Sequence, residues 1–232
     1  MVLANVFAAR ITDAFFVAFT IPNLFRRLVG EGTLTGAFVP IFTGWLEGSA
    51  EQTAGRTAEE RRSEAQRAFN ATWTLAALVG AGISVAGIVF ADPLVRVFAP
   101  GFLDDPAKFE LCVKLLRICF PYILLLSVFA VAMGALNALG HFFVPAIAPV
   151  VLNAFIITAA LLGRGAPEPI VWVAVAVVLA GAVQVLVQFP PLRARSLHPR
   201  PVFEPGHPLV RRLLTVMAPA VLGASVYQFN LL

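Results

Sequence analysis

Charged side chains are scarce in this chain, and their scarcity excludes most soluble folds. Of 232 residues, 13% are Asp, Glu, Lys or Arg, whereas soluble domains carry about 25%. Four stretches hold none of them: 69–91, 118–163, 169–192 and 213–232. Because a membrane-spanning helix needs about 20 apolar residues, each stretch can cross a bilayer. The sequence therefore predicts an all-α, polytopic transmembrane helix bundle.

Groups that catalyse reactions or hold metals are also few. The two cysteines, Cys112 and Cys119, lie seven residues apart, and small apolar packing is a commoner role for such residues than a disulfide or a metal site. Three scattered histidines have no ligand spacing, and no Ser-His-Asp arrangement or phosphate-binding loop occurs. We therefore expect no catalytic residue, metal or cofactor, and no enzyme activity. The basic residues behind the net charge of +4 collect between the spans, which indicates membrane topology and no nucleic-acid partner.

The expected spans form a single transmembrane domain. Residues 1–9 are too short to cross and are interpreted as the end of a first helix. The next run, 12–46, is interpreted as one long tilted helix with candidate breaks at Pro22, Pro40 and the glycines between them. Later helices are expected at 69–91, 117–137, 144–163, 169–190 and, as the start of a seventh, 213–232. Since both ends look cut inside helices, we interpret the chain as an N-terminal fragment.

The distribution of basic residues predicts the orientation. Segments 47–67, 138–144 and 193–212 together hold nine Lys or Arg, and segments 92–117 and 164–168 on the opposite face hold five. Cytoplasmic loops carry the excess of Lys and Arg. The first set is therefore predicted to lie in the cytoplasm.

Four charged residues interrupt the long run at 12–46: Asp13, Arg26, Arg27 and Glu31. An ionised group inside a bilayer costs a few kcal/mol, so such groups face a partner or water. The alternatives are simpler: the arginines could reach the headgroups, Glu31 could neutralise Arg27 one turn away, and Asp13 could lie in a first helical turn capped by Thr12.

If these groups instead face a cavity, the cavity suits an anion. A guanidinium group binds phosphate oxygens through two parallel hydrogen bonds, which the ammonium group of lysine cannot do. Arginines in an apolar cavity therefore favour a phosphate carried by a lipid. At 100° per residue, Asp13 and Arg27 share one stripe and Arg26 points elsewhere. A kink at Pro22 could rotate either arginine inward.

The run "TDAFFVAFTIPNLFRRLVGEGTLTGAFVPIF" resembles the signature of the MurJ, or MviN, family of bacterial lipid II flippases. Further pieces agree in order: "APGF" at 99–102, "FPYILL" at 120–125, "GALNALGHFFVPAIAPVVLN" at 134–153 and "APAVLG" at 218–223. The resemblance implies the N-terminal half of an exporter fold that has fourteen transmembrane helices in two bundles around a cationic cavity. It covers nearly the whole chain.

The resemblance also implies residue roles. Arg26 and Arg27 would bind substrate, with Arg26 holding the pyrophosphate, and Asp13 and Glu31 would act in gating or conformational change. The substrate would be lipid II, an undecaprenyl-diphosphate-linked disaccharide-peptide, flipped across the bacterial cytoplasmic (inner) membrane by alternating access. Membrane lipids would surround the protein, and other cell-wall synthesis proteins are candidate partners.

Three other functions remain open at this point. One is export of polysaccharide-linked lipids or drugs by the same superfamily. A second is an enzyme acting on polyprenyl diphosphates, and the third is a non-catalytic membrane scaffold.

Overall fold

The computed structural model describes residues 7, 9–29, 33–49 and 55–229; the side chains of 25–29, 33–35, 164 and 220–229 lie outside that description. Within it the chain forms helices and no strand, so the all-α prediction is confirmed. The helices are α2 (Ala9–Val29), α3 (Thr33–Glu47), α4 (Ala58–Val89), α5 (Ala91–Phe98), η1 (Pro100–Phe102), α6 (Pro106–Cys119), α7 (Pro121–Ala138), α8 (Phe143–Leu162), η2 (Gly163–Gly165), α9 (Pro169–Leu186), α10 (Phe189–Ala194) and α11 (Pro208–Phe229).

Four helical segments of the described chain are long and apolar enough to cross a membrane. They are Ala58–Val89, Pro106–Ala138, Phe143–Leu162 and Pro169–Ala194. Large apolar side chains cover the outside of these segments, among them Val85, Phe143 and Leu162, which are more than half exposed. Such a surface can face lipid hydrocarbon without cost, because apolar side chains have no hydrogen bonds to lose in the bilayer.

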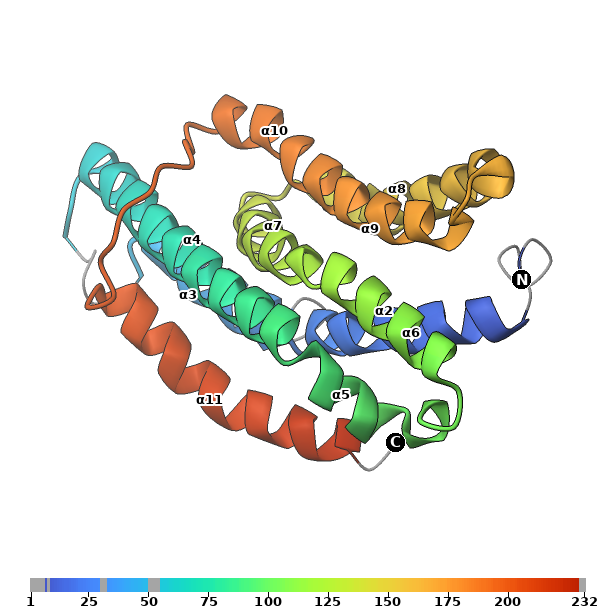
Figure 1. Ribbon diagram of the computed structural model, residues 1–232. Coiled ribbons are helices and arrows are strands. Elements are labelled where there is room, and N and C mark those ends of the chain that lie inside the picture. The colour runs from blue at the N-terminus through green and yellow to red at the C-terminus, as the bar shows by residue number, and fades with distance from the viewer. Residues whose placement is uncertain (1–6, 8, 30–32, 50–54, 230–232) are drawn as a thin grey trace.

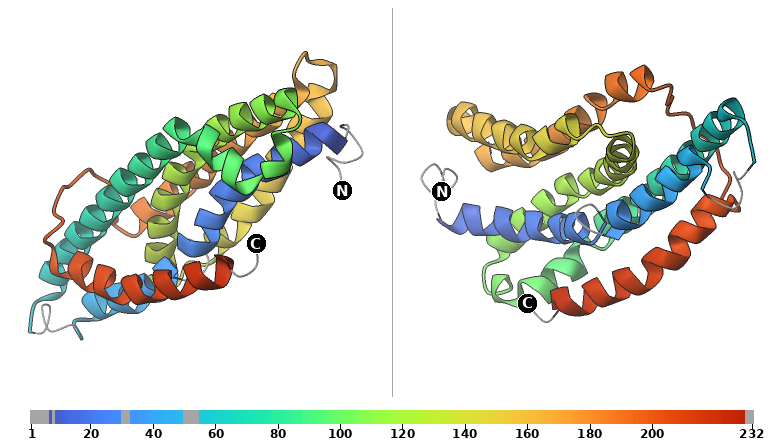
Figure 2. Two further views of the ribbon diagram at one scale, coloured as in Figure 1. Left: turned by 60° about the horizontal axis from the view of Figure 1, so that its bottom comes forward. Right: turned by 180° about the vertical axis from the view of Figure 1, so that it is seen from behind.

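The helices run back and forth between two ends of the molecule (Figures 1 and 2). The start of α4, the turn between α7 and α8, α10 and the start of α11 gather at one end, which we call the linker end after the linker, residues 195–207, between α10 and α11. The opposite end, the ion-pair end, holds α5, η1 and the starts of α2 and α6. α8 and α9 pack together as a hairpin beside α7.

The interior consists of two apolar clusters. Phe15 of α2, Tyr122 of α7 and Val173 of α9 belong to the larger cluster, in the middle and at the ion-pair end. The smaller cluster lies toward the linker end and contains Phe38, Phe42, Trp45, Phe69, Leu136 and Leu209. Because Trp45 and Leu209 are both almost fully buried in this cluster, α3 and the start of α11 are held firmly against α4 and α7.

Two expectations about residues 12–46 need correction. α2 begins at Ala9, so Thr12 is buried inside the helix and is not its cap. α2 continues through Pro22, and α3 continues through Pro40, because each proline removes one backbone donor and the rest of the helical hydrogen bonds remain. The described helices of this run are α2, which is described to Val29, and α3, which is described from Thr33; the candidate breaks at Gly30 and Gly32 lie outside the described residues, as does Glu31.

Two helices extend beyond their apolar runs into charged sequence. α4 begins at Ala58, where Thr57 and Glu60 form a reciprocal capping box. α6 begins at Pro106, where the Asp105 carboxylate accepts a hydrogen bond from the Lys108 amide at 3.2 Å. The expected span at 69–91 therefore corresponds to a helix that begins earlier and ends at Val89, and the expected span at 117–137 lies within the segment Pro106–Ala138. The polar ends of these segments carry the salt bridges described below.

Candidate functional site

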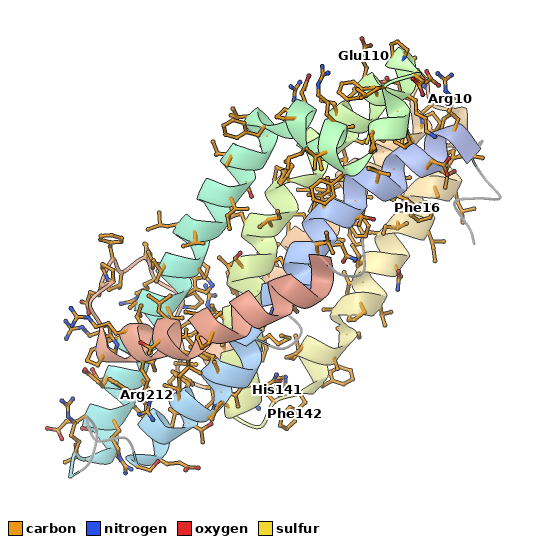
Figure 3. The ribbon with its side chains drawn as sticks, turned by 90° about the horizontal axis from the view of Figure 1, so that it is seen from below. Arg10, Phe16, Glu110, His141, Phe142 and Arg212 are labelled. Atoms are coloured by element: carbon orange, nitrogen blue, oxygen red, sulfur yellow. The ribbon has the colours of Figure 1, made fainter. Side chains whose placement is uncertain are left out.

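One face of α2 is open. Ala14, Phe15 and Ala18 are buried against the bundle, whereas Asp13, Phe16 and Thr20 are exposed. The exposed residues recur every three or four positions, so they form one stripe along the helix. Figure 3 shows this open side of α2, with Phe16 labelled on it.

Asp13 forms an ion pair with a residue that sequence reasoning did not single out. Lys108 Nζ lies 3.2 Å from Asp13 Oδ2. The ammonium group also lies 4.1 Å from the centre of the Phe102 ring. The Lys108 side chain is only 17% exposed, and this carboxylate and the negative face of the ring are the groups that contact its ammonium.

A second ion pair joins the same elements one turn earlier. Arg10 of α2 donates to the carboxylate of Asp105, the residue that caps α6. This hydrogen bond from Arg10 holds the pKa of Asp105 below its ordinary value of 3.8. The two pairs have opposite polarity, because α2 supplies the cation in one and the anion in the other. They fix the axial position of α2 against α6.

Further charges surround shallow hollows at the ion-pair end. One hollow of about 460 Å³ has Arg10, Lys108, Glu110, Lys114 and Glu168 among its lining residues, and Arg10 and Glu110 mark this end in Figure 3. Lys114 and Glu168 pair at 2.6 Å. Because its described charges are of both signs and largely paired, this hollow is no simple anion site.

Arg26 and Arg27 lie on α2 beyond Pro22, but their side chains are outside the described part of the structure, and so is all of Glu31. The helical backbone still fixes their depth. Arg26 is 13 residues from Asp13 along a helix without interruption, which is about 20 Å at 1.5 Å per residue. With Asp13 at the ion-pair end, both arginines lie well away from that end, in the last described turn of α2.

Asn153 is a polar residue that sequence reasoning missed. It lies in the middle of α8, is exposed, and makes no side-chain hydrogen bond with the described residues. An exposed amide at that depth is costly in lipid, which favours water or protein beside this edge of α8. An Asn within the uncharged run "VVLNAFIIT" was the available signal.

Metal ligands do not gather anywhere in the described residues: no group of three or more His, Cys, Asp or Glu could hold an ion. Cys112 and Cys119 are both free and buried.

Comparison with known proteins places the chain in a family. A sequence profile described as "Lipid II flippase MurJ" matches residues 3–232. The lipid II flippase MurJ of Burkholderia cenocepacia is 39% identical over 230 residues, which is 97% of this chain and 42% of that protein. The chain thus spans less than half the length of this relative.

Two solved structures share the fold. A lipid II flippase MurJ in an inward closed conformation superposes with a TM-score of 0.69 at 21% identity, covering 95% of this chain and 42% of its own. A transporter of the MOP superfamily from Pyrococcus furiosus gives a TM-score of 0.73 at 16% identity, covering 98% of this chain and 48% of its own. At these identities the likeness concerns the fold.

Proposed function

The chain belongs to the lipid II flippase MurJ family, and from this membership we propose that it contributes one helix bundle to a transporter that moves lipid II across the bacterial cytoplasmic membrane. The observation that carries the proposal is the match of the family profile across residues 3–232. In this assignment α2 and α3 together are the second helix of the family fold. α4, α6 with α7, α8, and α9 with α10 are helices three to six, and α11 is the seventh.

The proposed mechanism is transport without covalent chemistry. The diphosphate of lipid II binds Arg26 and Arg27, because guanidinium groups match phosphate oxygens in geometry and charge. Their depth on α2, about 20 Å from Asp13, suits a headgroup that is crossing the bilayer. The bundle then moves against its partner bundle between inward-facing and outward-facing states.

Asp13 and Glu31 have conformational roles in this proposal. The Asp13–Lys108 pair at 3.2 Å and the Arg10–Asp105 pair support the role of Asp13, because charges at one end of a span can hold a gate closed and can exchange partners when it opens. Glu31 is the nearest carboxylate in sequence to Arg27, at four residues, and would balance its charge when no substrate is bound.

Asn153 extends the proposed binding surface. Its exposed amide on α8 can donate to and accept from the sugar and peptide groups of the headgroup.

The proposed orientation of the bundle in the membrane places the linker end in the cytoplasm, because the segments at that end carry the excess of basic residues. Membrane lipids surround the apolar exterior, and other proteins of cell-wall synthesis are candidate partners at either surface.

Substitution of Arg26 tests the proposal in a full-length transporter that carries residues 1–232. Cells depleted of their own flippase are supplied with wild type, Arg26→Ala, Arg26→Lys or the control Arg62→Ala, which changes an exposed arginine of α4 that has no ion pair among the described residues. Wild type and Arg62→Ala restore growth and the delivery of lipid II to the outer leaflet. Arg26→Ala restores neither, and Arg26→Lys restores part of both.

Two outcomes contradict the proposal. Wild type that reaches the membrane but delivers no lipid II excludes the flippase function. Normal delivery by Arg26→Ala, at equal protein level, excludes Arg26 as a binding residue, and the same comparison with Arg27→Ala decides for its neighbour.

A further inference from the structure

The linker runs along α4, and the spacing of its contacts matches the spacing of side chains on one face of that helix. Gln66, Asn70 and Thr74 are spaced four residues apart and so form one stripe of α4. They bond to His198, Arg200 and Val202 of the linker, which are spaced two apart. A four-residue step along an α-helix is about 6.0 Å, and a two-residue step along an extended chain is about 6.6 Å. Because the two repeats nearly match, three successive contacts stay in register.

Each contact satisfies the backbone of the linker with a side chain. The Gln66 amide donates to the His198 carbonyl at 2.8 Å and accepts from the His198 amide at 2.7 Å. The Arg200 amide donates to Asn70 Oδ1 at 3.1 Å, and the Val202 amide donates to Thr74 Oγ1 at 2.8 Å. Asn70 is only 4% exposed, so loss of its contact would leave a buried polar group unpaired.

The sequence of the linker fits this arrangement. In "HPRPV", residues 198–202, the two residues without an N–H group, Pro199 and Pro201, alternate with the three amides that bond to α4. Proline therefore occupies the positions whose donors α4 does not use. It also fixes its own φ angle and holds the preceding residue in an extended conformation. The linker loses little conformational freedom when it binds, because the prolines have already restricted it.

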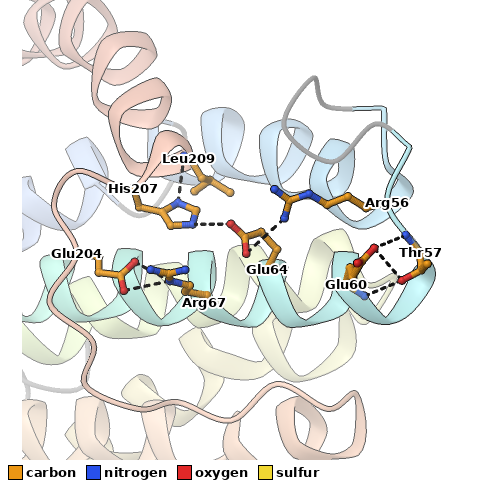
Figure 4. Close-up of polar contacts among 8 residues, drawn as sticks. All are labelled: Arg56, Thr57, Glu60, Glu64, Arg67, Glu204, His207 and Leu209. Carbon is orange, nitrogen blue, oxygen red and sulfur yellow. Dashed lines mark hydrogen bonds and ion pairs between the residues drawn. The ribbon is translucent and has the colours of Figure 1, made fainter.

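Contacts on both sides of this ladder complete the attachment. Leu197 is buried before it. After it, Glu204 accepts from Arg67 Nε at 2.9 and 3.1 Å, and His207 lies at the start of α11, where its Nδ1 accepts from the Leu209 amide at 3.2 Å (Figure 4). The His207 ring is 5.1 Å from that of Trp45. The linker is thus attached to α3 and α4 at several points between His198 and His207.

We propose that the linker is a rigid strut and not the hinge between the two bundles. It stays bound to α4 in the inward-facing and the outward-facing state, so α11 begins at a point that moves with the first bundle. The bending that accompanies transport then occurs beyond His207. The inference rests on the proposed function, because it concerns the motion of that transporter.

A disulfide between the linker and α4 tests the strut. In a full-length transporter that carries residues 1–232 and has Cys112→Ala and Cys119→Ala, the substitutions Thr74→Cys and Val202→Cys place one thiol on α4 and one on the linker, at the two residues that the hydrogen bond from the Val202 amide to Thr74 Oγ1 joins at 2.8 Å. We expect the pair to oxidise readily and the oxidised transporter to flip lipid II within about twofold of the reduced one. Each single cysteine variant, under the same oxidant, is the matched control.

Loss of transport on oxidation, restored by reduction, would overturn the inference, because it would show that the linker must leave α4. A pair that neither oxidises nor is joined by a short bis-maleimide cross-linker would overturn it as well, because such a reagent tolerates thiols that are close but misaligned. Neither result depends on weak activity of the variant, since the oxidised and reduced forms of one protein are compared.

Amide hydrogen exchange, first on the wild-type transporter and then on single variants, gives a second test that does not require a transport measurement. The amides of Arg200 and Val202 should be protected at least tenfold relative to an unstructured peptide in both conformational states. Asn70→Ala should speed exchange at Arg200, whereas Ser63→Ala on the exposed surface of α4 should not. Free exchange in either state contradicts the strut. A transporter that shows protection but moves no lipid II contradicts the proposed function and leaves the attachment standing.

Discussion

Gly87 of α4 lies directly against the ring of Phe120: a β-carbon on this glycine would come within 2.0 Å of the ring atom Cε1. The Ser84 hydroxyl, one turn earlier, donates to the Phe120 carbonyl at 2.9 Å. Phe120 is the residue between α6 and α7, before Pro121. The close approach therefore fixes α4 against the point where the long segment from Pro106 to Ala138 passes from one helix to the next.

Gly87→Ala should destabilise the protein by about 1–3 kcal/mol, because the added methyl group needs space that the Phe120 ring fills and well-packed interiors do not yield it freely. The measurement is the thermal unfolding midpoint in detergent. Gly82→Ala on the same helix is the control, since a β-carbon there meets nothing within 4 Å. Equal midpoints for the two variants would show that the ring moves aside at little cost.

If the Asp13–Lys108 ion pair supports transport, exchanging the two charges should restore the function that either single substitution removes. Asp13→Lys or Lys108→Asp alone replaces the native attraction, 3.2 Å between Nζ and Oδ2, with two neighbouring like charges. Each should lower transport by the full-length protein, whereas the double exchange should recover much of it. A double-mutant cycle on the free energy of unfolding should give a coupling energy of about 0.5 kcal/mol, which is typical of partly exposed ion pairs. A double variant as impaired as the worse single one would show that Asp13 acts without Lys108.

The class of fold and the spans could be predicted because uncharged runs of about 20 residues have few alternatives. The start of α4 could not, since a stretch such as 58–67, dense in both signs of charge, is compatible with a loop or with a helix in water. Only the capping box at Thr57 and Glu60 indicates the helix. Pro22 and Pro40 were expected to break helices that continue through them.

The candidate site was less accessible to sequence reasoning because its contacts are long-range. Lys108 is 95 residues from Asp13, and nothing in the local pattern joins the two. The ladder between α4 and the linker joins residues about 130 apart. Each of its halves looks ordinary alone, as a polar helical stripe and as a proline-rich loop, and only the fold brings the two spacings together.

His207 should make stability depend on pH. Burial, partly opposed by the charges of Glu64 and Glu204, holds its pKa below 6.5. The unfolded chain therefore takes up the proton more readily than the folded one. Stability is fully present above pH 6.5 and should fall as the pH drops through 6.5 toward the lower pKa of the folded state. The ring cannot accept from the Leu209 amide once Nδ1 is protonated.

The unfolding midpoint at pH 7.5 and pH 5.5 checks this, with His207→Asn as the matched variant. Asn keeps an acceptor at the start of α11 and does not titrate, so the variant should lose less of its stability on acidification than wild type. Glu64 Oε1, 3.9 Å from Nε2, would attract the protonated ring and reduce the effect, and Arg67 nearby opposes protonation. Identical losses for wild type and His207→Asn would assign the pH dependence to other groups.

Asn153 should matter for transport and little for folding. Because its amide is exposed and unbonded within the described structure, Asn153→Leu removes no internal hydrogen bond and should leave the unfolding midpoint unchanged or raised. If the amide contacts the headgroup during passage, the same change should slow lipid II transport by about fivefold, the equivalent of one hydrogen bond of about 1 kcal/mol. Asn153→Ser keeps a polar group, so its transport rate should lie between those of wild type and Asn153→Leu.

Ile157→Leu is the control for Asn153, since Ile157 lies one turn further along α8 and is also exposed, at 40%, but offers no polar group. It should leave transport unchanged. Labelling provides an independent measurement: a cysteine at position 153 should react with a water-soluble maleimide in intact membranes. Unimpaired transport by Asn153→Leu together with an unreactive cysteine would show that lipid or protein covers this edge of α8, and the binding surface would then be confined to α2.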